Sequence, residues 1–306
     1  MNSTSAKDYL MLHLVVLIWG FTAILGLLIS IPAVEIVFYR TLIASGILGL
    51  FFLLRKRNMR LPKEDFWKVI GTGALIGMHW ILFFGAARVA TASVCLAGIA
   101  TCSLWTAFLE PMVNKSQVKW YEVMLGLIVL LGLYVIFRFE FEHWEGLLMA
   151  VASAFLGACF TVSNGLLTKK HSAYLLTFYE MAGACAFSVL FMPIYAYYWA
   201  GESGLQLIPT AADWFWLLVL SGICTVYAFS VSVELMKRLS VFVINLSVNM
   251  EPVYGIALAV LIFGEKEKMT EGFYFGTLII LASVALYPVF NYVYKKRKNK
   301  QLLRVQ

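Results

Sequence analysis

Apolar runs of about 20 residues recur along this chain, and a short polar connection follows each of them. A helix of that length crosses the hydrocarbon core of a bilayer, so each run predicts one membrane span. The connections are too short to hold folded domains of their own. Hydropathy and breaker residues place ten predicted spans in the sequence: 9–28, 34–54, 67–87, 92–112, 120–137, 145–167, 173–199, 213–236, 240–263 and 272–293.

The composition favours the same class of protein. Hydrophobic residues make up 61% of the 306 residues, and charged residues make up only 13%. A soluble domain carries roughly 25% charged residues, because it needs a polar surface that this chain cannot supply. We therefore expect an all-α integral membrane protein with ten transmembrane helices.

The basic residues predict how the chain is oriented. If the N-terminus is cytoplasmic, 19 of the 24 Lys and Arg residues fall in cytoplasmic segments. Four others are external, namely Arg88, Arg138, Lys266 and Lys268, and Arg40 lies within a span. Basic residues beside spans mark the cytoplasmic side and contact anionic lipid. This predicts a multi-pass inner-membrane protein with both termini in the cytoplasm, bound to anionic lipid and not to nucleic acid.

An internal repeat divides the chain into two halves. Phe38-Tyr39-Arg40 matches Phe178-Tyr179-Glu180 at an offset of 140 residues, and an offset of 149 aligns Gly73 with Gly222 and Ser103 with Pro252. Five spans per half place the second half upside down in the bilayer, a recurrent transporter design. We expect two inverted five-helix repeats, 9–137 and 145–293, around a central cavity, followed by a basic cytoplasmic tail at 294–306.

Six short motifs occur in order along the chain: Trp19-Gly20-Phe21, Phe38-Tyr39-Arg40, Ala87-Arg88-Val89-Ala90-Thr91-Ala92-Ser93, Leu235-Met236-Lys237-Arg238-Leu239-Ser240, Glu251-Pro252 and Phe263-Gly264-Glu265. In these motifs the sequence resembles the EamA-type transporters of the drug/metabolite transporter superfamily. The resemblance implies ten helices, a cavity near the midplane, and movement of amino acids or similar small metabolites, often outward. One departure is Ser103, which stands where the family usually has a proline, so roles cannot be transferred between the halves by symmetry.

Three Arg or Glu residues lie at least six residues inside the ends of predicted spans, where a charge is expensive. Arg40 suits a substrate carboxylate, although a structural ion pair would explain it as well. Glu251 precedes Pro252, which frees a backbone carbonyl, and it is a candidate polar site or proton relay. Glu180, at the position that repeats Arg40, is a second candidate for a proton or an ammonium group, or it anchors a loop beside Lys169 or Lys170.

Further candidates are polar or aromatic residues inside the spans. His79 could titrate during transport, although the glycines before it, Gly71, Gly73 and Gly77, more simply indicate close helix packing. Core packing explains the aromatic residues as well as a substrate cavity does. The remaining candidate substrate-binding residues are Trp19, Thr22, Trp80, Thr101, Trp105, Asn164, Tyr179, Tyr227, Asn245 and Asn249, with Ser103 and Ser163 as further polar positions.

Other chemistry receives little support. The five cysteines form no Cys-x-x-Cys pair and the four histidines are scattered, so we expect no metal and no cofactor. No phosphate-binding Gly-Lys-Thr loop is present, which leaves a proton gradient, a sodium gradient or substrate exchange as the energy source. The sequence predicts a secondary transporter and exporter working by alternating access, as a monomer or homodimer. The alternative is a non-transporting sensor or a lipid-modifying enzyme, whose nearest polar cluster would be Glu140, Glu142, His143 and Glu145.

Overall fold

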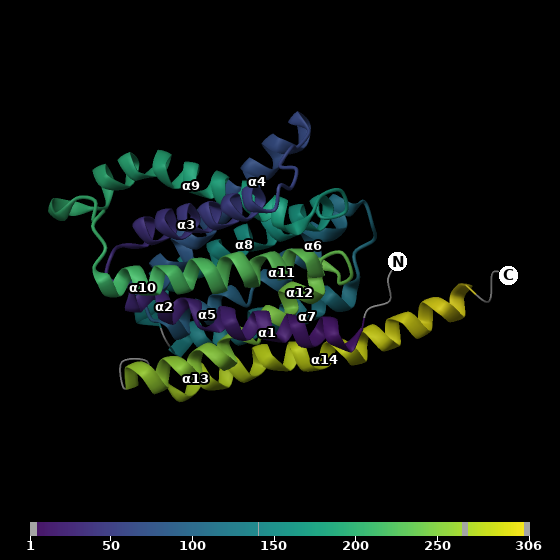
Figure 1. Cartoon of the computed structure of the whole chain (residues 1–306). Coiled ribbons are helices and arrows are strands. Elements are labelled where there is room, and N and C mark those ends of the chain that lie inside the picture. The colour runs from purple at the N-terminus through teal and green to yellow at the C-terminus, as the bar shows by residue number, and fades with distance from the viewer. Residues whose placement is uncertain (1–4, 140, 265–268, 303–306) are drawn as a thin grey trace.

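A computed structural model describes residues 5–139, 141–264 and 269–302 (Figure 1). Within these residues ten helical segments are long and apolar enough to cross a membrane, as the sequence predicts. Six of the ten are single helices: α3 (Ala33–Leu54), α4 (Lys63–Val89), α7 (Trp120–Phe139), α8 (Trp144–Leu167), α9 (Ala173–Tyr198) and α14 (Glu271–Leu302). Short 3-10 turns, η1 (Phe141–His143) and η2 (Gly201–Ser203), precede α8 and follow α9.

The other four spans are interrupted helices. Span 1 consists of α1 (Ala6–Gly20) and α2 (Thr22–Leu28), and span 4 of α5 (Ala92–Ile99) and α6 (Cys102–Asn114). Span 9 consists of α12 (Val241–Val248) and α13 (Glu251–Phe263). Span 8 joins α10 (Ala211–Val219) to α11 (Ala228–Leu235) through η3, a π-helical stretch (Leu220–Tyr227). Interrupted helices are where transporters place binding groups, because irregular backbone is tolerated only beside a cavity or inside protein.

The interruptions of spans 4 and 9 match each other. Ala100 and Asn249 are 149 residues apart, the offset that the sequence repeat predicts. At both turns the backbone changes to hydrogen bonds three residues apart: Thr101 N bonds Gly98 O, and Met250 N bonds Ser247 O. Pro252 does not cause the second interruption, because it lies in the first turn of α13, where an amide has no intrahelical partner. The expectation that Pro252 removes a helical hydrogen bond was therefore wrong.

Reciprocal contacts show that the two halves occupy equivalent places. The Tyr39 hydroxyl, on α3, donates to Leu207 O in the loop after α9, at 2.7 Å. The Tyr179 hydroxyl, on α9, donates to Met59 O in the loop after α3, also at 2.7 Å. Each half therefore contacts the equivalent loop of the other half, the one that follows its second span. Because each half crosses the membrane five times, the second half runs in the opposite sense.

The last helix of each half packs against its counterpart. α7 lies along α14, and a Cβ at Gly132 would come 2.6 Å from Gly276 O, while a Cβ at Gly276 would come 2.6 Å from Gly132 O. Glycine is required at both places because the two backbones approach too closely for a side chain. The expected glycine packing on α4 is found in part: Gly73 lies against Glu180 O, whereas Gly71 has no neighbour within 4 Å.

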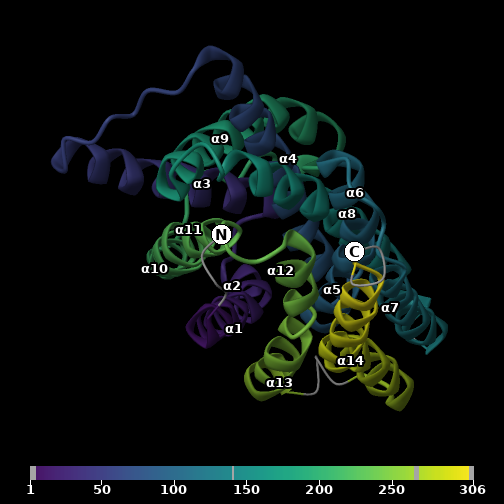
Figure 2. The ribbon, with the colours of Figure 1, turned by 90° about the vertical axis from the view of Figure 1, so that its right-hand side faces the viewer.

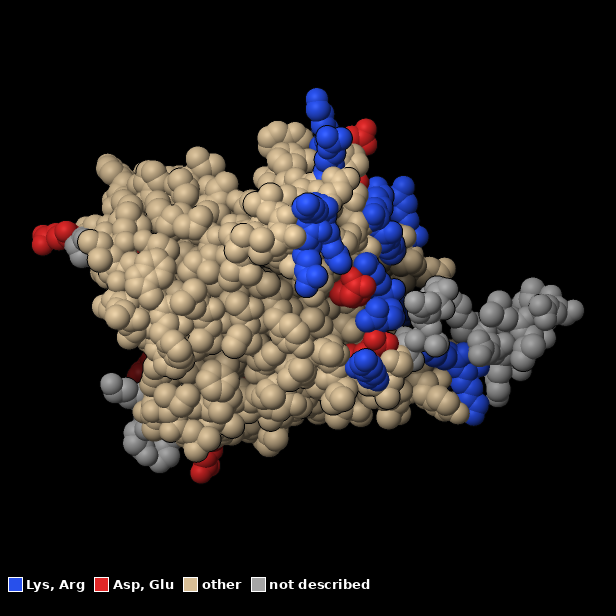
Figure 3. All heavy atoms as spheres, viewed as in Figure 1, with Lys and Arg blue, Asp and Glu red and all other residues tan. Residues whose placement is uncertain are grey.

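Both termini lie at one end of the bundle, which Figure 2 shows from that side. Lys and Arg side chains gather at the same end. On the face drawn in Figure 3, the charged side chains that are visible at the opposite end are acidic. We call the first end the basic end. Some residues used in the orientation prediction lie outside the described residues: Lys266, Lys268, Arg304 and the side chains of Lys298 and Lys300. Glu140, from the polar cluster of the alternative function, and Glu265, from the family resemblance, lie outside them too.

The α7–α14 contact predicts the effect of a small substitution. Gly132→Ala places a methyl group against the Gly276 backbone, and overpacking of this kind costs about 1–3 kcal/mol. We expect thermal unfolding of the purified protein in detergent to begin at a clearly lower temperature. Gly71→Ala is the matched control, because nothing lies within 4 Å of its new Cβ. Equal melting temperatures for the two variants would contradict the close contact.

Candidate functional site

A cavity lies among the interrupted helices. The volume that the centre of a water molecule can occupy in it is about 80 Å³. One bound water needs roughly 10–15 Å³ by the same measure, so the cavity has room for several. Its walls come from α1, α2, α3, α4, α5, α6, α8, α11, α12 and α13. The third, fourth, eighth and ninth spans contribute, and so do the first, second and sixth spans. α7, α9 and α14 contribute no lining residue.

Arg40 is the cation of the cavity. Its side chain is only 2% exposed, and its guanidinium lies 3.6 Å from the centre of the Trp80 ring. Nε donates to Thr225 Oγ1 at 2.7 Å. Among the described residues its two terminal nitrogens form no hydrogen bond and no acidic side chain pairs with it. A buried guanidinium held this way keeps its planar pair of donors available for an anion.

The π-helical stretch η3 supplies the polar contacts that hold this wall. Thr225, which receives the Arg40 hydrogen bond, donates its own proton to Leu220 O at 2.9 Å. The indole nitrogen of Trp19 donates to Cys224 O at 3.1 Å, which ties span 1 to the same stretch. π-helical turns are rare and occur mostly at functional sites. Here the turn positions both the cation and an aromatic wall.

Glu251 is the carboxylate of the cavity. It is 4% exposed and begins α13, directly after the interruption of span 9. Among the described residues its carboxylate has no hydrogen bond and no ion pair. Arg40 and Glu251 line the same cavity from different helices, and no ion pair joins them. The cavity therefore holds one guanidinium and one carboxyl group that do not pair with each other.

Asn245 joins three helices beside Glu251. Its amide nitrogen donates to Thr106 Oγ1 at 2.7 Å and to Thr161 Oγ1 at 2.8 Å, which connects α12 with α6 and α8. Both threonine hydroxyls donate in turn to carbonyls of their own helices. The two amide hydrogens are thus used, and the amide oxygen is left to accept a hydrogen bond from a ligand.

His79 is a fixed, neutral donor pair with Ser153. Its Nδ1 lies 2.7 Å from Ser153 O, and the Ser153 hydroxyl donates to His79 O at 2.8 Å. A carbonyl oxygen only accepts, so Nδ1 carries a proton, and in the neutral ring Nε2 is then the acceptor nitrogen. The ring lines the cavity next to Phe160, with centroids 5.2 Å apart. This arrangement explains His79 through packing between α4 and α8 and leaves one acceptor for a ligand.

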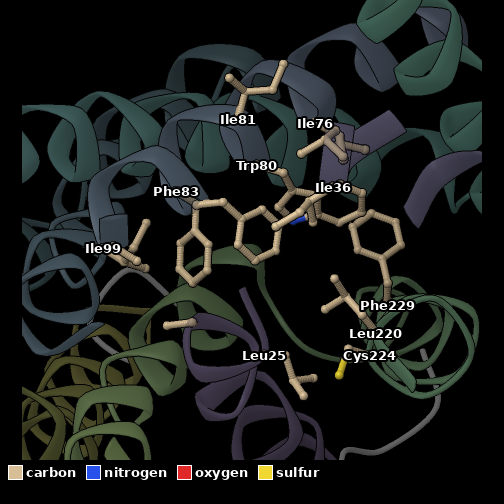
Figure 4. Close-up of a cluster of buried hydrophobic side chains, with 14 of the residues drawn as sticks. Leu25, Ile36, Ile76, Trp80, Ile81, Phe83, Ile99, Leu220, Cys224 and Phe229 are labelled. Carbon is tan, nitrogen blue, oxygen red and sulfur yellow. The ribbon is translucent and has the colours of Figure 1, made fainter. Parts of the chain in front are cut away.

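Aromatic rings cover much of the remaining wall. Figure 4 shows Phe229 from α11 directed toward Trp80 from α4, with Phe83, also from α4, to the left of them in this view. Trp80 and Phe229 meet edge to face, with centroids 6.1 Å apart. Phe160 from α8 lies 6.1 Å from Phe229. The cavity is therefore an apolar chamber with a few polar groups at fixed places, which is the usual character of a small-molecule site.

Half of the candidate residues lie on the cavity wall: Trp19, Thr22, Arg40, His79, Trp80, Asn245 and Glu251. The other half lie elsewhere: Thr101, Trp105, Asn164, Tyr179, Glu180, Tyr227 and Asn249.

Those outside the wall serve other contacts. Tyr227 is 41% exposed, because the π-helical turn rotates it outward, and its hydroxyl points to Met11 Sδ. Tyr179 binds Met59 O near the basic end, and Trp105 packs edge to face on Phe155. These three residues therefore do not line the cavity in this conformation.

Thr101 and Asn249 belong to the two helix interruptions. The Thr101 hydroxyl donates to Gly98 O at 2.9 Å. The Asn249 amide donates to Ser103 Oγ at 3.3 Å and so joins the interruption of span 9 to that of span 4. Both residues hold the backbone that surrounds the cavity and do not face it.

Several lining residues were not among the candidates: Phe83, Ile99, Phe160, Thr161, Phe229, Ser232 and Ile244. Thr106, Ser153 and Thr225 were also missed; they form hydrogen bonds with the lining residues Asn245, His79 and Arg40, respectively. Hydropathy treats these residues as ordinary members of apolar spans. Only the rotation of each helix within the bundle shows which of them face inward, so the sequence offered no direct signal.

A family model that describes the EamA-like transporter family matches residues 6–138 and 144–287. The chain belongs to the EamA-like transporter family. Both repeats are matched, as the sequence comparison of the two halves predicts, and the family consists of transporters rather than enzymes. The protein is therefore a multi-pass membrane protein of a transporter family whose members act on small molecules.

One solved crystal structure superposes on this EamA-family chain with a TM-score of 0.66 at 18% sequence identity. The match covers 92% of this chain and 97% of the other, so the whole fold is shared. At that identity the likeness concerns the fold alone. No protein among the curated sequences matches the chain.

The Asn245 contacts predict a measurable stability loss. Asn245→Ala removes two hydrogen bonds between helices, which average about 0.6 kcal/mol each in membrane proteins, so we expect a loss of about 1 kcal/mol. The midpoint of unfolding in detergent and denaturant measures it. Asn114→Ala, an exposed position at the end of α6, should leave the midpoint unchanged. If Asn245→Ala behaved like the control, the three-helix connection would carry no stability.

Proposed function

We propose that this protein is a secondary transporter that exports amino acids or similar small metabolites across the inner membrane by alternating access. The observation that carries the proposal is a buried cavity with an unpaired guanidinium on one wall and an unpaired carboxylate on another. Buried charges are costly in a membrane protein and are kept where a ligand or an ion uses them. The two groups match the two charges of a zwitterionic amino acid.

The roles follow from the chemistry of each group. Arg40 binds the substrate carboxylate through its terminal nitrogens, because Trp80 and Thr225 fix the guanidinium plane. Glu251 binds the ammonium group, and the Asn245 amide oxygen accepts from the same group. The rings of Trp19, Phe83, Phe160 and Phe229 surround the substrate side chain. This lining favours apolar or aromatic side chains over charged ones.

Polar contacts support an occluded end opposite the basic end. Arg88 Nη2 donates to Gly26 O at 3.0 Å and to Ile29 O at 2.7 Å. The Asp213 carboxylate accepts from the Ser30 amide and hydroxyl at 2.6 and 2.7 Å. These bonds join spans 1, 3 and 8. Alternating access requires them to open in the other conformation, when the repeats exchange their arrangements.

Charge distribution supports the orientation. Both termini lie at the basic end, and that end faces the cytoplasm by the positive-inside rule. Anionic lipid of the inner leaflet contacts the same end. Export is the direction that the family resemblance implies. A proton or sodium gradient supplies the energy.

Ligand binding tests the charge assignment. We expect the purified protein to melt at a higher temperature with L-phenylalanine or L-leucine, because a ligand that binds the folded state stabilises it. Phenylalaninamide, which lacks the carboxylate, should stabilise far less. Arg40→Gln should weaken binding of the amino acid at least about 10-fold, since a charge-assisted hydrogen bond contributes about 1.5–3 kcal/mol. Arg138→Gln, an exposed arginine, is the matched control.

Vesicle transport separates the two function classes. Reconstituted protein should exchange labelled amino acid across the bilayer, and Glu251→Gln should lower this exchange. Equal stabilisation by phenylalaninamide would contradict the role of Arg40. Binding without any flux through wild-type vesicles would favour a non-transporting sensor instead.

The orientation is tested separately from transport. A fluorescent protein that matures only in the cytoplasm should be bright when it is fused to the C-terminus. The same reporter inserted after Glu202, in the loop at the opposite end, should stay dark. Fluorescence from the Glu202 insertion together with a dark C-terminal fusion would reverse the proposed orientation.

A further inference from the structure

Glu180 and Asn164 form a buried polar pair outside the cavity. Both side chains are 0% exposed, Glu180 on α9 and Asn164 on α8, and the two interact. Neither carboxylate oxygen of Glu180 has a hydrogen-bond partner among the described residues, and the same holds for both polar atoms of Asn164. Buried polar atoms almost always have a partner, so four unsatisfied atoms in one place need an explanation.

No charge compensates Glu180. α3, α4 and α11 pack against α9, and no charged or titratable side chain of the described residues on these helices or on α8 interacts with its carboxyl group. The titratable groups of the surrounding helices face other partners: Arg40 faces Trp80, His79 faces Ser153, Asp65 faces His171 and Glu234 faces Lys237. An ionised carboxylate here would be an isolated charge in an apolar interior.

A bound proton resolves this arrangement. A protonated carboxyl group donates one hydrogen bond and accepts another, and an amide side chain does the same. Glu180 and Asn164 can therefore complete each other's hydrogen bonds only when the acid holds a proton. A small inward movement of either side chain then satisfies the pair, and no charge remains.

Glu180 is also the counterpart of Arg40. The preceding ring pairs, Phe38–Tyr39 and Phe178–Tyr179, both have centroids 5.0 Å apart, and their tyrosines form the reciprocal loop contacts described above. Arg40 lies where α3 meets η3 of span 8, and Glu180 lies where α9 meets α4 of span 3. Arg40 faces the cavity while Glu180 is sealed. The two repeats thus hold equivalent residues in two different arrangements, one facing the cavity and one buried away from it.

We propose that Glu180 and Asn164 form a proton-binding site, sealed in this conformation, that is exposed to the cavity when the two repeats exchange their arrangements. Glu180 then takes the place that Arg40 holds here, loses its proton to the water of the cavity, and must regain one before it is sealed again. The proton that Glu180 releases into the cavity is regained from the same cavity before the site is sealed, so a cycle moves no net proton, and the bound proton controls when the repeats can return to this conformation. The coupling to transport rests on the proposed function, but the presence of the proton does not.

Infrared spectroscopy tests the bound proton without any substrate. Wild-type protein in lipid at neutral pH should show the carbonyl band of a protonated buried carboxylic acid. Glu180→Gln should remove one component of that band, and Asn164→Leu should shift this component, since its hydrogen-bond partner is gone. Glu35→Gln and Glu251→Gln, which alter other buried carboxyl groups, should leave this component in place. A wild-type spectrum without the band, or a band that is unchanged in Glu180→Gln, would overturn the proposal.

The pH dependence of exchange tests the coupling. Exchange of labelled L-leucine is measured in vesicles whose internal and external pH are equal, over a series of pH values. We expect wild-type exchange to slow as the pH rises, because an ionised Glu180 cannot be sealed, and we expect Glu180→Gln to exchange with less dependence on pH. An identical pH dependence of the two proteins would overturn the coupling. If wild-type vesicles move no amino acid, the proposed function fails, and the infrared result still decides the proton site.

Discussion

The interior of a bilayer offers no water, so every polar group within the spans must find a partner inside the protein. Most of the buried hydroxyls here donate to a carbonyl three or four residues back in their own helix, as Thr41, Thr106 and Thr161 do. The arrangement of the bundle depends on this constraint. Where buried groups lack such a partner, two sites stand out: the cavity with Arg40 and Glu251, and the buried pair Glu180 and Asn164.

Arg40 illustrates how this constraint shapes the cavity wall. A guanidinium buried among helices needs support, and it receives an aromatic face from α4 and one hydroxyl from the π-helical stretch of span 8. Those two contacts hold its position without using its terminal nitrogens. The same stretch also accepts the Trp19 hydrogen bond from span 1. One irregular turn thus connects three spans around the cavity.

The inverted repeat gives the fold two equivalent halves in unequal surroundings. α7 and α14 meet through reciprocal glycines, and each half binds the same loop of the other through a tyrosine. The sequence has diverged at the positions that carry charge, with Arg40 in one half and Glu180 in the other. Two halves of the same shape can present either Arg40 or Glu180 to one cavity. Identical halves would present the same side chain in both arrangements.

The sequence by itself determined the class, the ten spans, the repeat offsets and the family, because hydropathy and spacing depend only on the order of residues. It also pointed to Arg40, Glu251 and Asn245, since a polar residue deep in an apolar run stands out. It did not determine which side of each helix faces inward. Tyr227 lies on a π-helical turn and faces outward, and no residue pattern predicts that turn. Pro111 lies within α6, and the helix continues through it. Span 4 is instead interrupted at Ala100 and Thr101, where there is no proline. These outcomes depend on the rotation and the contacts of neighbouring helices, and only the tertiary structure decides them.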